Sequence, residues 1–265
     1  MGSTPDAVRA VGSPRAPRLR PAQRLARRGV ERVAGAILRS RAADLGLTRH
    51  RGRRDRRVVA LTFDDGPVQG GTERVLDALA ELGVQATFFC VGVNAERHPE
   101  LIRRAVAEEH VIAAHSMWHN RLDALPLSGA GHITRCQTVL HAITGHTPAL
   151  YRAPWGWLTP WEALRLRRRG LTIVGWSVYT RDANQPPPPV AAMLARTLAR
   201  VRPGAIILCH DGFAAADACD RPATVALVRA LVPELRARGY DFVTIPGMLG
   251  TSAYQVADSS ADMDG

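Results

Sequence analysis

The chain has 265 residues, and 46% of them are apolar, which is enough for a sizeable core in one large domain or two small ones. The net charge of +11 comes from residues 1–57, where 16 arginines face four acids, because the rest of the chain carries 19 basic and 20 acidic residues. A nearly neutral body argues against nucleic acid as a main partner. A basic arm on such a body is typical of a tether or an anionic docking surface.

The extension at residues 1–57 begins with Pro, Gly, Ser and Arg and is predicted to be partly disordered. Within it, residues 22–47 have apolar positions at helical spacing, interleaved with arginines. This segment is predicted to form an amphipathic helix that can lie on an anionic membrane surface. A solvated helix, partly docked on the main body, is the alternative.

Cysteine usage and hydropathy bear on the compartment. Cys90, Cys136, Cys209 and Cys219 show no paired metal-ligand spacing and are predicted to be small buried thiols in a reducing compartment. No segment approaches 18 consecutive apolar residues, and acidic and proline residues occupy the N-terminus where a signal peptide would carry its apolar stretch. The sequence therefore predicts a cytoplasmic protein, with membrane association or export as the alternative.

From residue 58 the chain alternates between short apolar runs and longer segments of helical periodicity. Strands are predicted at residues 58–63, 84–91, 111–114, 149–152, 171–178, 205–210 and 240–245. Helices are predicted at residues 73–82 with Thr72 as the cap, and at residues 99–108, 130–143, 159–169, 190–201 and 223–238. Seven βα units predict an α/β fold with a closed or nearly closed parallel barrel, and an open doubly wound sheet is the alternative.

Side chains with catalytic potential gather at the carboxyl ends of the predicted strands. They are Asp64 and Asp65 after the first strand, His115 and His119 after the third, Arg152 at the end of the fourth, Asp182 after the fifth and His210 at the end of the sixth. The carboxyl ends of the strands in a βα barrel carry the active-site loops. These residues are therefore expected to meet at one mouth of the barrel.

His115 and His119 have the spacing that places two imidazoles on one side of a helical turn, within reach of one metal ion. A carboxylate from Asp64 or Asp65 would complete a two-histidine, one-aspartate set with positions left open for water. Successive side chains of an extended chain point opposite ways, so one aspartate can bind the metal while the other accepts a proton. Alone, each feature also fits an incidental histidine pair or a polar turn, but together they favour a catalytic metal site.

A metal held in this way lowers the pKa of bound water to roughly 7 and polarises a carbonyl, which suits hydrolysis of an amide or ester. Asp64 fits the base that takes the proton of the water, and His210 fits the acid that protonates the leaving group, with a structural histidine as its alternative. Arg152 can orient a carboxylate or be a surface arginine. Asp182 can fix the tautomer of His210 or be a turn aspartate.

Four motifs resemble those of the polysaccharide deacetylases of the NodB-homology group, carbohydrate esterase family four. They are Thr62-Phe63-Asp64-Asp65-Gly66-Pro67, His115-Ser116-x-x-His119, Arg152-Ala153-Pro154-Trp155-Gly156 and Leu208-Cys209-His210. The resemblance covers residues 58–248. It implies a distorted (β/α)7 barrel as the catalytic domain at residues 58–250, preceded by the basic extension and followed by a flexible tail at residues 251–265.

The resemblance also implies a ligand set and catalytic roles. The implied metal is divalent, usually zinc, and its ligands are Asp65, His115 and His119. Asp64 is implied as the general base, Arg152 as its orienting partner and His210 as the general acid. Asp182 aligns with the aspartate that tunes this histidine.

The reaction that the resemblance implies is removal of N-acetyl groups from amino sugars in a glycan of the chitooligosaccharide or peptidoglycan type. Removal of O-acetyl groups, or of N-formyl groups from a lipid-linked sugar, is the nearest alternative. A carbohydrate-binding protein without catalytic activity is the alternative from another class. The presence of Asp64 and His210 argues against it, because sugar binding alone requires neither residue.

The fourth motif departs from the family pattern. Where the family often shows Asp-x-x-Asp-Trp, this chain has Tyr179-Thr180-Arg181-Asp182-Ala183, so the first aspartate and the tryptophan are replaced. The change bears on substrate fit more than on the chemistry. The aromatic residues predicted either to stack on sugars near the mouth or to belong to the core are Trp118, Trp155, Trp157 and Tyr179.

Overall fold

The computed structural model describes residues 46–120, 131–214 and 216–256. The predicted amphipathic helix at residues 22–47 lies almost entirely outside the described residues, and so does the end of the predicted tail. Within the described ranges, no helix is both long enough and apolar enough to cross a membrane.

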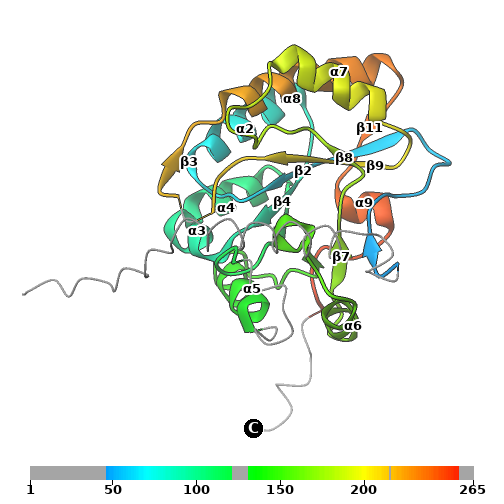
Figure 1. The fold of residues 1–265 in the computed structure, drawn as a ribbon. Helices are drawn as coiled ribbons and strands as arrows, with labels where there is room; N and C mark the ends of the chain where they lie inside the picture. The colour runs from blue at the N-terminus through cyan, green and yellow to red at the C-terminus, as the bar shows by residue number, and fades with distance from the viewer. Residues whose placement is uncertain (1–45, 121–130, 215, 257–265) are drawn as a thin grey trace, which may run out of the picture. The chain divides into compact units, whose positions relative to one another are not determined.

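A curled sheet of nine strands forms the centre of the described chain, and its named strands pair in parallel throughout (Figure 1). In spatial order these are β1 (Thr48–Arg49), β7 (Thr172–Val174), β6 (Leu150–Tyr151), β5 (Val111–Ala114), β4 (Thr87–Cys90), β2 (Val58–Asp64), β9 (Ala205–His210) and β8 (Val178–Tyr179), with β11 (Asp241–Phe242) beside the start of β2. A separate small sheet contains β3 (Gln69–Gly70) and β10 (Ala218–Cys219). Each of the seven predicted strands is present, so the predicted parallel α/β architecture is confirmed.

One segment of chain contributes strands near both ends of the curled sheet. The run predicted as a single strand at residues 171–178 contains β7 and the start of β8, separated by residues 175–177. β7 pairs with β6, whereas β8 pairs with β9. This stretch of chain therefore pairs with β6 at one end and with β9 at the other, although β6 and β9 are far apart in the spatial order. The sheet curls so that both pairings can form, which gives the distorted barrel.

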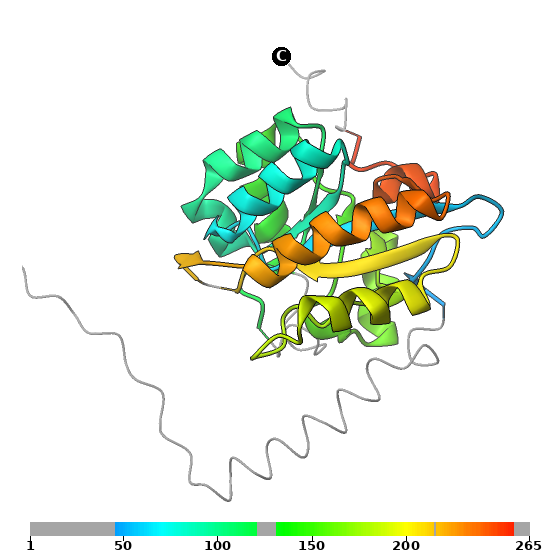
Figure 2. The same cartoon turned by 90° about the horizontal axis from the view of Figure 1, so that it is seen from above.

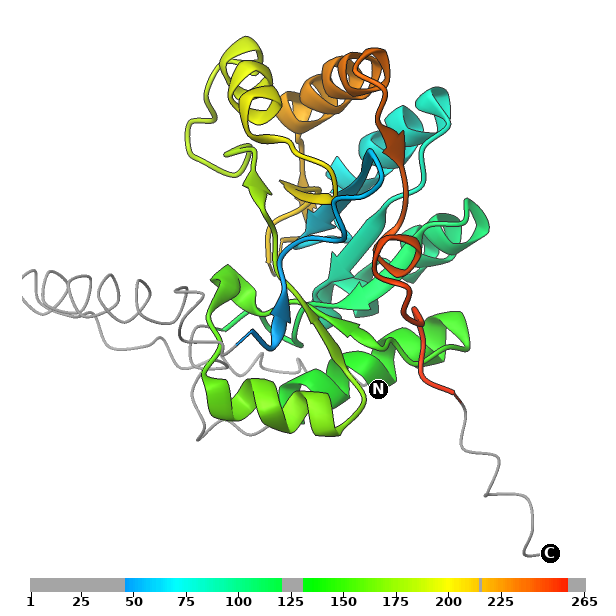
Figure 3. The ribbon, with the colours of Figure 1, turned by 90° about the vertical axis from the view of Figure 1, so that its right-hand side faces the viewer.

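Helices surround the sheet on its outer face (Figures 2 and 3). They are α2 (Gly71–Leu82), α3 (Gly92–Arg97), α4 (Pro99–Ala107), α5 (Gly131–Thr144), α6 (Pro160–Arg168), α7 (Val190–Arg200) and α8 (Pro222–Ala237). The short helix α9 (Ile245–Leu249) instead packs through Ile245 and Met248 against the core inside the barrel, and a 3-10 helix spans Pro154–Gly156. α8 packs against both α2 and α7. The six predicted helices are present. α3 and α9 were not predicted, because helices of six and five residues hold too few turns to show a periodic pattern.

The predicted capping role of Thr72 is wrong. The cap of α2 is Gly70, and Thr72 lies inside the first turn with its side chain buried. Its hydroxyl accepts a hydrogen bond from Val68 N at 2.8 Å and donates one to Asp211 Oδ2 at 2.7 Å. The Thr72 hydroxyl therefore binds Asp211, which is distant in sequence, and does not cap the helix as the local sequence predicts.

The central strand β2 is buried along its whole length and packs into two cores. Val59, Leu61 and Phe63 belong to the outer core beneath the helices, whereas Val58 and Ala60 belong to the core inside the barrel. Side chains alternate between the two faces of a strand. The same alternation directs Thr62 and Asp64 into the barrel interior at the carboxyl end of β2.

All four cysteines are free thiols, as predicted. Cys90, Cys136 and Cys209 are buried, and Cys219 is half-buried. Burial raises the pKa of the Cys136 thiol to about 12, so it stays protonated and unreactive at neutral pH.

The described fold extends past residues 58–250 at both ends. β1, which belongs to the predicted extension, pairs with β7, and Arg51 bridges to Ala205. In the predicted tail, Tyr254 bridges to Pro148. The division into extension, catalytic domain and tail stays a prediction, with these two segments packed on the sheet.

Truncation of Leu79 tests the packing between α2 and the sheet. Leu79 is fully buried in the outer core, so Leu79→Ala is expected to lower the free energy of unfolding by about 2–5 kcal/mol, measured by urea denaturation. The exposed Arg229 serves as control, and Arg229→Ala should change it by no more than about 0.5 kcal/mol. Equal effects of the two substitutions would contradict this account of the core.

Candidate metal-dependent active site

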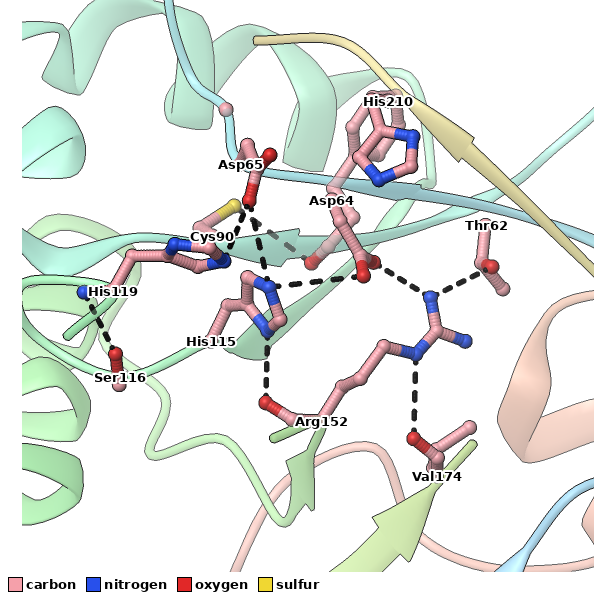
Figure 4. Close-up of polar contacts among 12 residues, drawn as sticks. Thr62, Asp64, Asp65, Cys90, His115, Ser116, His119, Arg152, Val174 and His210 are labelled. Carbon is pink, nitrogen blue, oxygen red and sulfur yellow. Dashed lines mark hydrogen bonds and ion pairs between the residues drawn. The ribbon is translucent and has the colours of Figure 1, made fainter. Parts of the chain in front are cut away.

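The structure brings together the seven predicted site residues at the carboxyl ends of the strands, and Figure 4 labels all of them except Asp182. Five of them line one cavity of about 710 Å³, namely Asp64, Asp65, His115, His119 and His210. The other two lie directly behind this wall, because Arg152 pairs with Asp64 and Asp182 pairs with His210. The predicted convergence at one mouth is therefore present.

Asp65, His115 and His119 form a group that fits a metal ion. Their potential ligand atoms all lie within 4.8 Å of one another. Asp65 Oδ1 is 3.5 Å from His115 Nε2 and 3.2 Å from His119 Nε2. Asp65 Oδ1 is also buried without a hydrogen-bond partner, which is costly for a carboxylate oxygen unless a cation meets it.

The two histidines do not lie on a helical turn, so that part of the prediction is wrong. The residues after β5 form a loop in which Ser116 has φ 68° and His119 has φ 50°. The loop is fastened by the Ser116 hydroxyl, which accepts a hydrogen bond from His119 N at 3.0 Å. Left-handed backbone, rather than helical periodicity, turns the second imidazole towards the first.

The surroundings of the two histidines set their tautomer and their protonation. His115 Nδ1 lies 2.8 Å from the carbonyl oxygen of Arg152, which accepts its proton and leaves Nε2 free to face Asp65. Burial lowers the pKa of His119 to about 4, so this imidazole is neutral at physiological pH, as a ligand must be. Burial alone would lower the pKa of His115, but Asp64 and Asp65 raise it above its ordinary value, so metal binding there would release a proton.

Arg152 is fully buried and fixes the side chain of Asp64. Its Nη1 donates to Asp64 Oδ1 at 2.6 Å and to Thr62 Oγ1 at 2.9 Å. Its Nε and Nη2 donate to the carbonyl oxygens of Val174 and Gly175, and its guanidinium lies 4.0 Å from the centre of the Phe89 ring. Arg152 is therefore not a surface arginine, and the second oxygen of Asp64 is left facing the metal ligands, 3.7 Å from His115 Nε2.

His210 is paired with Asp182 on the other side of the cavity. Asp182 Oδ1 is 3.0 Å from His210 Nδ1, and Asp182 Oδ2 accepts the His210 backbone N–H at 2.7 Å. Thr180 and Thr224 donate their hydroxyls to the same carboxylate, each at 2.8 Å. Burial would lower the pKa of His210, but the charge of Asp182 raises it to about 9, so the imidazole is protonated at neutral pH.

Aromatic residues surround the mouth, and one of them was not predicted. Trp155 and Tyr179 line the cavity as expected, with the Trp155 ring 4.1 Å from that of His119. Trp176 also lines it, from the link between β7 and β8, a position that reads from sequence as an ordinary strand interior. Trp118, which directly precedes the cavity residue His119, does not line the cavity itself. Its side chain is 46% exposed, and the guanidinium of Arg135 lies 5.4 Å from the centre of its ring.

Known deacetylases resemble this chain in sequence. Residues 51–174 match the family model described as polysaccharide deacetylase. A chitooligosaccharide deacetylase from Bradyrhizobium sp. (strain ANU 289) is 38% identical over 198 residues, which cover 72% of this chain and 90% of that protein. The chain belongs to the polysaccharide deacetylase family. The predicted enzyme class, a hydrolase acting on carbon–nitrogen bonds other than peptide bonds, is thereby confirmed.

Solved structures of the family share the fold. A peptidoglycan N-acetylglucosamine deacetylase superposes with a TM-score of 0.74 at 30% identity, covering 79% of this chain and 95% of that one. A family 4 carbohydrate esterase from Streptomyces lividans superposes with a TM-score of 0.63 at 30% identity, covering 76% and 97%. The distorted barrel is thus the fold of this family, whose deacetylases generally depend on a divalent metal.

The pairing of His210 with Asp182 gives a testable prediction. In NMR titrations His210 should show a pKa of about 9, and in Asp182→Asn the pKa should fall below 6.5, because burial remains while the compensating charge is lost. Because the pKa of His210 is higher in the folded state, its pairing with Asp182 stabilises the fold. This contribution is fully present below pH 6.5 and is lost as the pH rises through 9. A wild-type pKa near 6.5 would contradict this account of the pair.

Proposed function

We propose that this protein removes N-acetyl groups from N-acetylated amino sugars of an oligosaccharide or polysaccharide, of the chitooligosaccharide or peptidoglycan type. The observation that carries the proposal is the single cavity in which Asp64 and His210 lie beside the Asp65, His115 and His119 set. A metal set flanked by a fixed carboxylate and a protonated imidazole suits hydrolysis of an amide.

The metal in this proposal is zinc, held by Asp65, His115 and His119. Two imidazoles and one carboxylate are a frequent ligand set of catalytic zinc, with further positions open to water and substrate. When bound, zinc supplies a Lewis acid that polarises a carbonyl and lowers the pKa of water to roughly 7.

Asp64 would accept the proton of the attacking water. Its carboxylate is held on one side by Arg152 at 2.6 Å, which leaves the other oxygen turned towards the metal ligands. This arrangement fixes the base without side-chain rearrangement, which is how a positioned group accelerates proton transfer. Arg152 contacts the base and not the substrate in this proposal, and so acts as its positioning residue.

His210 would donate its proton to the amide nitrogen as the carbon–nitrogen bond breaks. A pKa of about 9 keeps the proton available at neutral pH, and Asp182 holds the Nδ1 side of the ring, so that Nε2 faces the cavity. The oxygen of the water joins the acetyl carbon, and the products are the free amine and acetic acid, which releases its proton to solvent and becomes acetate. The proton taken by Asp64 and the proton given by His210 balance the reaction.

The names of relatives support this substrate class. Those of the matched proteins specify chitooligosaccharide and peptidoglycan N-acetylglucosamine, and the Streptomyces lividans esterase was solved with acetate, which is the product of such a reaction. The complete catalytic set argues against the non-catalytic sugar-binding alternative. Contact of residues 1–57 with an anionic membrane surface stays a prediction.

Acetate release from purified full-length protein tests the proposal. Zinc-loaded protein should release acetate from N-acetylchitooligosaccharides or peptidoglycan fragments, and removal of the metal by a chelator should abolish the release until zinc is restored. Asp64→Asn and His210→Ala should each lower kcat at least about 100-fold, because each removes one proton-transfer group.

The matched control for the acid-base variants is Asp77→Asn, which changes an exposed aspartate on α2 and should leave kcat unchanged. No acetate from any N-acetylated glycan, with faster hydrolysis of O-acetylated or N-formylated sugars in the same panel, would replace the proposed reaction with one of its alternatives.

Trp118 tests whether the substrate reaches beyond the cavity. Its exposed ring can stack on a sugar distant from the reacting acetamide, so Trp118→Ala should raise KM for a tetrasaccharide about 3- to 10-fold with kcat unchanged. The KM for a disaccharide, which extends over fewer sugars from the reacting acetamide, should not change. An equal rise for both substrates would instead indicate damage to the neighbouring metal ligand His119.

A further inference from the structure

We propose that Asp211 and Asn94 are positioning residues that hold the backbone of Asp65 in the conformation that aims its carboxylate at His115 and His119. The proposal rests on Asp65 serving as a metal ligand. Neither Asp211 nor Asn94 takes part in the mechanism above. Both are buried, at 1% and 0% exposed, in places where a polar side chain needs a reason to be retained.

Asp211 ties the turn after β2 to the turn after β9. Its Oδ1 accepts the Gly66 N–H at 3.1 Å, and its Oδ2 accepts the Thr72 hydroxyl at 2.7 Å. Its own backbone N–H donates to the carbonyl oxygen of Asp64 at 3.2 Å. Asp211, which directly follows His210, is therefore hydrogen-bonded to the residues on both sides of Asp65.

The close approach of these two turns requires glycine. A Cβ added to Gly66 would overlap the Asp211 carboxylate, and one added to Gly212 would lie 3.0 Å from the carbonyl oxygen of Asp65. The absence of both side chains lets the two turns meet backbone to backbone. The contact between the two turns therefore depends on glycine at both positions.

Asn94, in α3, makes the second grip. Its Nδ2 donates to the carbonyl oxygen of Asp65 at 2.7 Å and to that of Phe213 at 3.1 Å, so one amide group joins the same two turns. Beside it, the Val91 N–H donates to the carbonyl oxygen of Gly66 at 2.9 Å. The carbonyl groups of Asp65 and Gly66 are both fixed by the segment that begins α3.

Asp65 needs such support because its backbone is left-handed, with φ 78°. This conformation is disfavoured for residues with a Cβ and persists where surrounding contacts enforce it. If the turn relaxed, the carboxylate would swing away from the two imidazoles. The grips by Asp211 and Asn94 therefore set the geometry of the metal site from outside it.

The test is the zinc affinity of folded variants, measured by competition with a chelating dye. Asp211→Ala and Asn94→Ala should each weaken zinc binding about 10- to 100-fold, which is the usual effect of losing a group that orients a ligand. Asp211→Asn keeps an oxygen for the Gly66 N–H and should stay within about threefold of the wild type. This rescue separates positioning from a requirement for negative charge.

The matched control is Gln137→Ala, which removes a buried side chain whose amide donates to the carbonyl oxygen of Pro148 at 2.7 Å, away from the site. It should lower the melting temperature as the test variants do while leaving zinc affinity unchanged. Wild-type affinity in Asn94→Ala and Asp211→Ala, or equal weakening in Gln137→Ala, would overturn the proposal. If Asp211→Ala does not fold, Asn94→Ala and Asp211→Asn decide the question.

Failure of this inference is distinguishable from failure of the proposed function. Wild-type protein that binds zinc but releases no acetate would refute the deacetylase proposal, while the affinities would still decide the positioning roles. Acetate release that persists in variants with unchanged zinc affinity would refute only the positioning roles.

Discussion

The buried ion pair between Arg152 and Asp64 is the constraint on which the rest of the site depends. A guanidinium without exposure to solvent is tolerated only if its charge is paired and its donors are satisfied. Four acceptors from β2 and from the end of β7 surround it, so the strands of the barrel must close around this one side chain. The carbonyl group of the same residue fixes His115, so the proposed base and a proposed metal ligand share one anchor.

The site concentrates unusual backbone conformations. Six non-glycine residues of the described chain have positive φ, and five of them lie in the site loops: Asp65, Ser116, His119, Trp155 and Arg181. Such conformations cost free energy and are maintained by the packing around them. The site loops are attached to β2, which is buried along its whole length. β2 and the outer core beneath the helices supply the free energy that offsets these strained conformations.

The fourth motif departs from the family pattern at the cavity wall but keeps the aspartate that pairs with His210. Asp182 makes four hydrogen bonds, two of them with His210, so Tyr179 and Ala183 leave the support of the proposed acid intact. Tyr179 packs its ring at 6.0 Å from that of His210, and Ala183 lines the cavity with a small side chain. Trp176 supplies an aromatic wall from the link between β7 and β8. The substitutions thus reshape the part of the cavity that would meet the sugar.

Local sequence determined much of the fold and the identity of the candidate site residues. Apolar β-branched runs such as that of β2 specify buried strands, and carboxylates and imidazoles placed after parallel strands must meet at one end of the sheet. Strand alternation is equally local, so the inward direction of Asp64 follows from that of Ala60. The order of the motifs further specified the family, because each motif is a short stretch of chain.

Only the tertiary structure decided the contacts between distant segments. The helical turn expected for His115 and His119 gave way to a left-handed loop. The cap expected of Thr72 gave way to a bond with Asp211, because a long-range partner outweighed local propensity. Two of the four acceptors of Arg152 are backbone carbonyl groups, which every residue carries and no sequence pattern marks. For the same reason the grips of Asn94 and Asp211 on the Asp65 turn became visible only when the chain was folded.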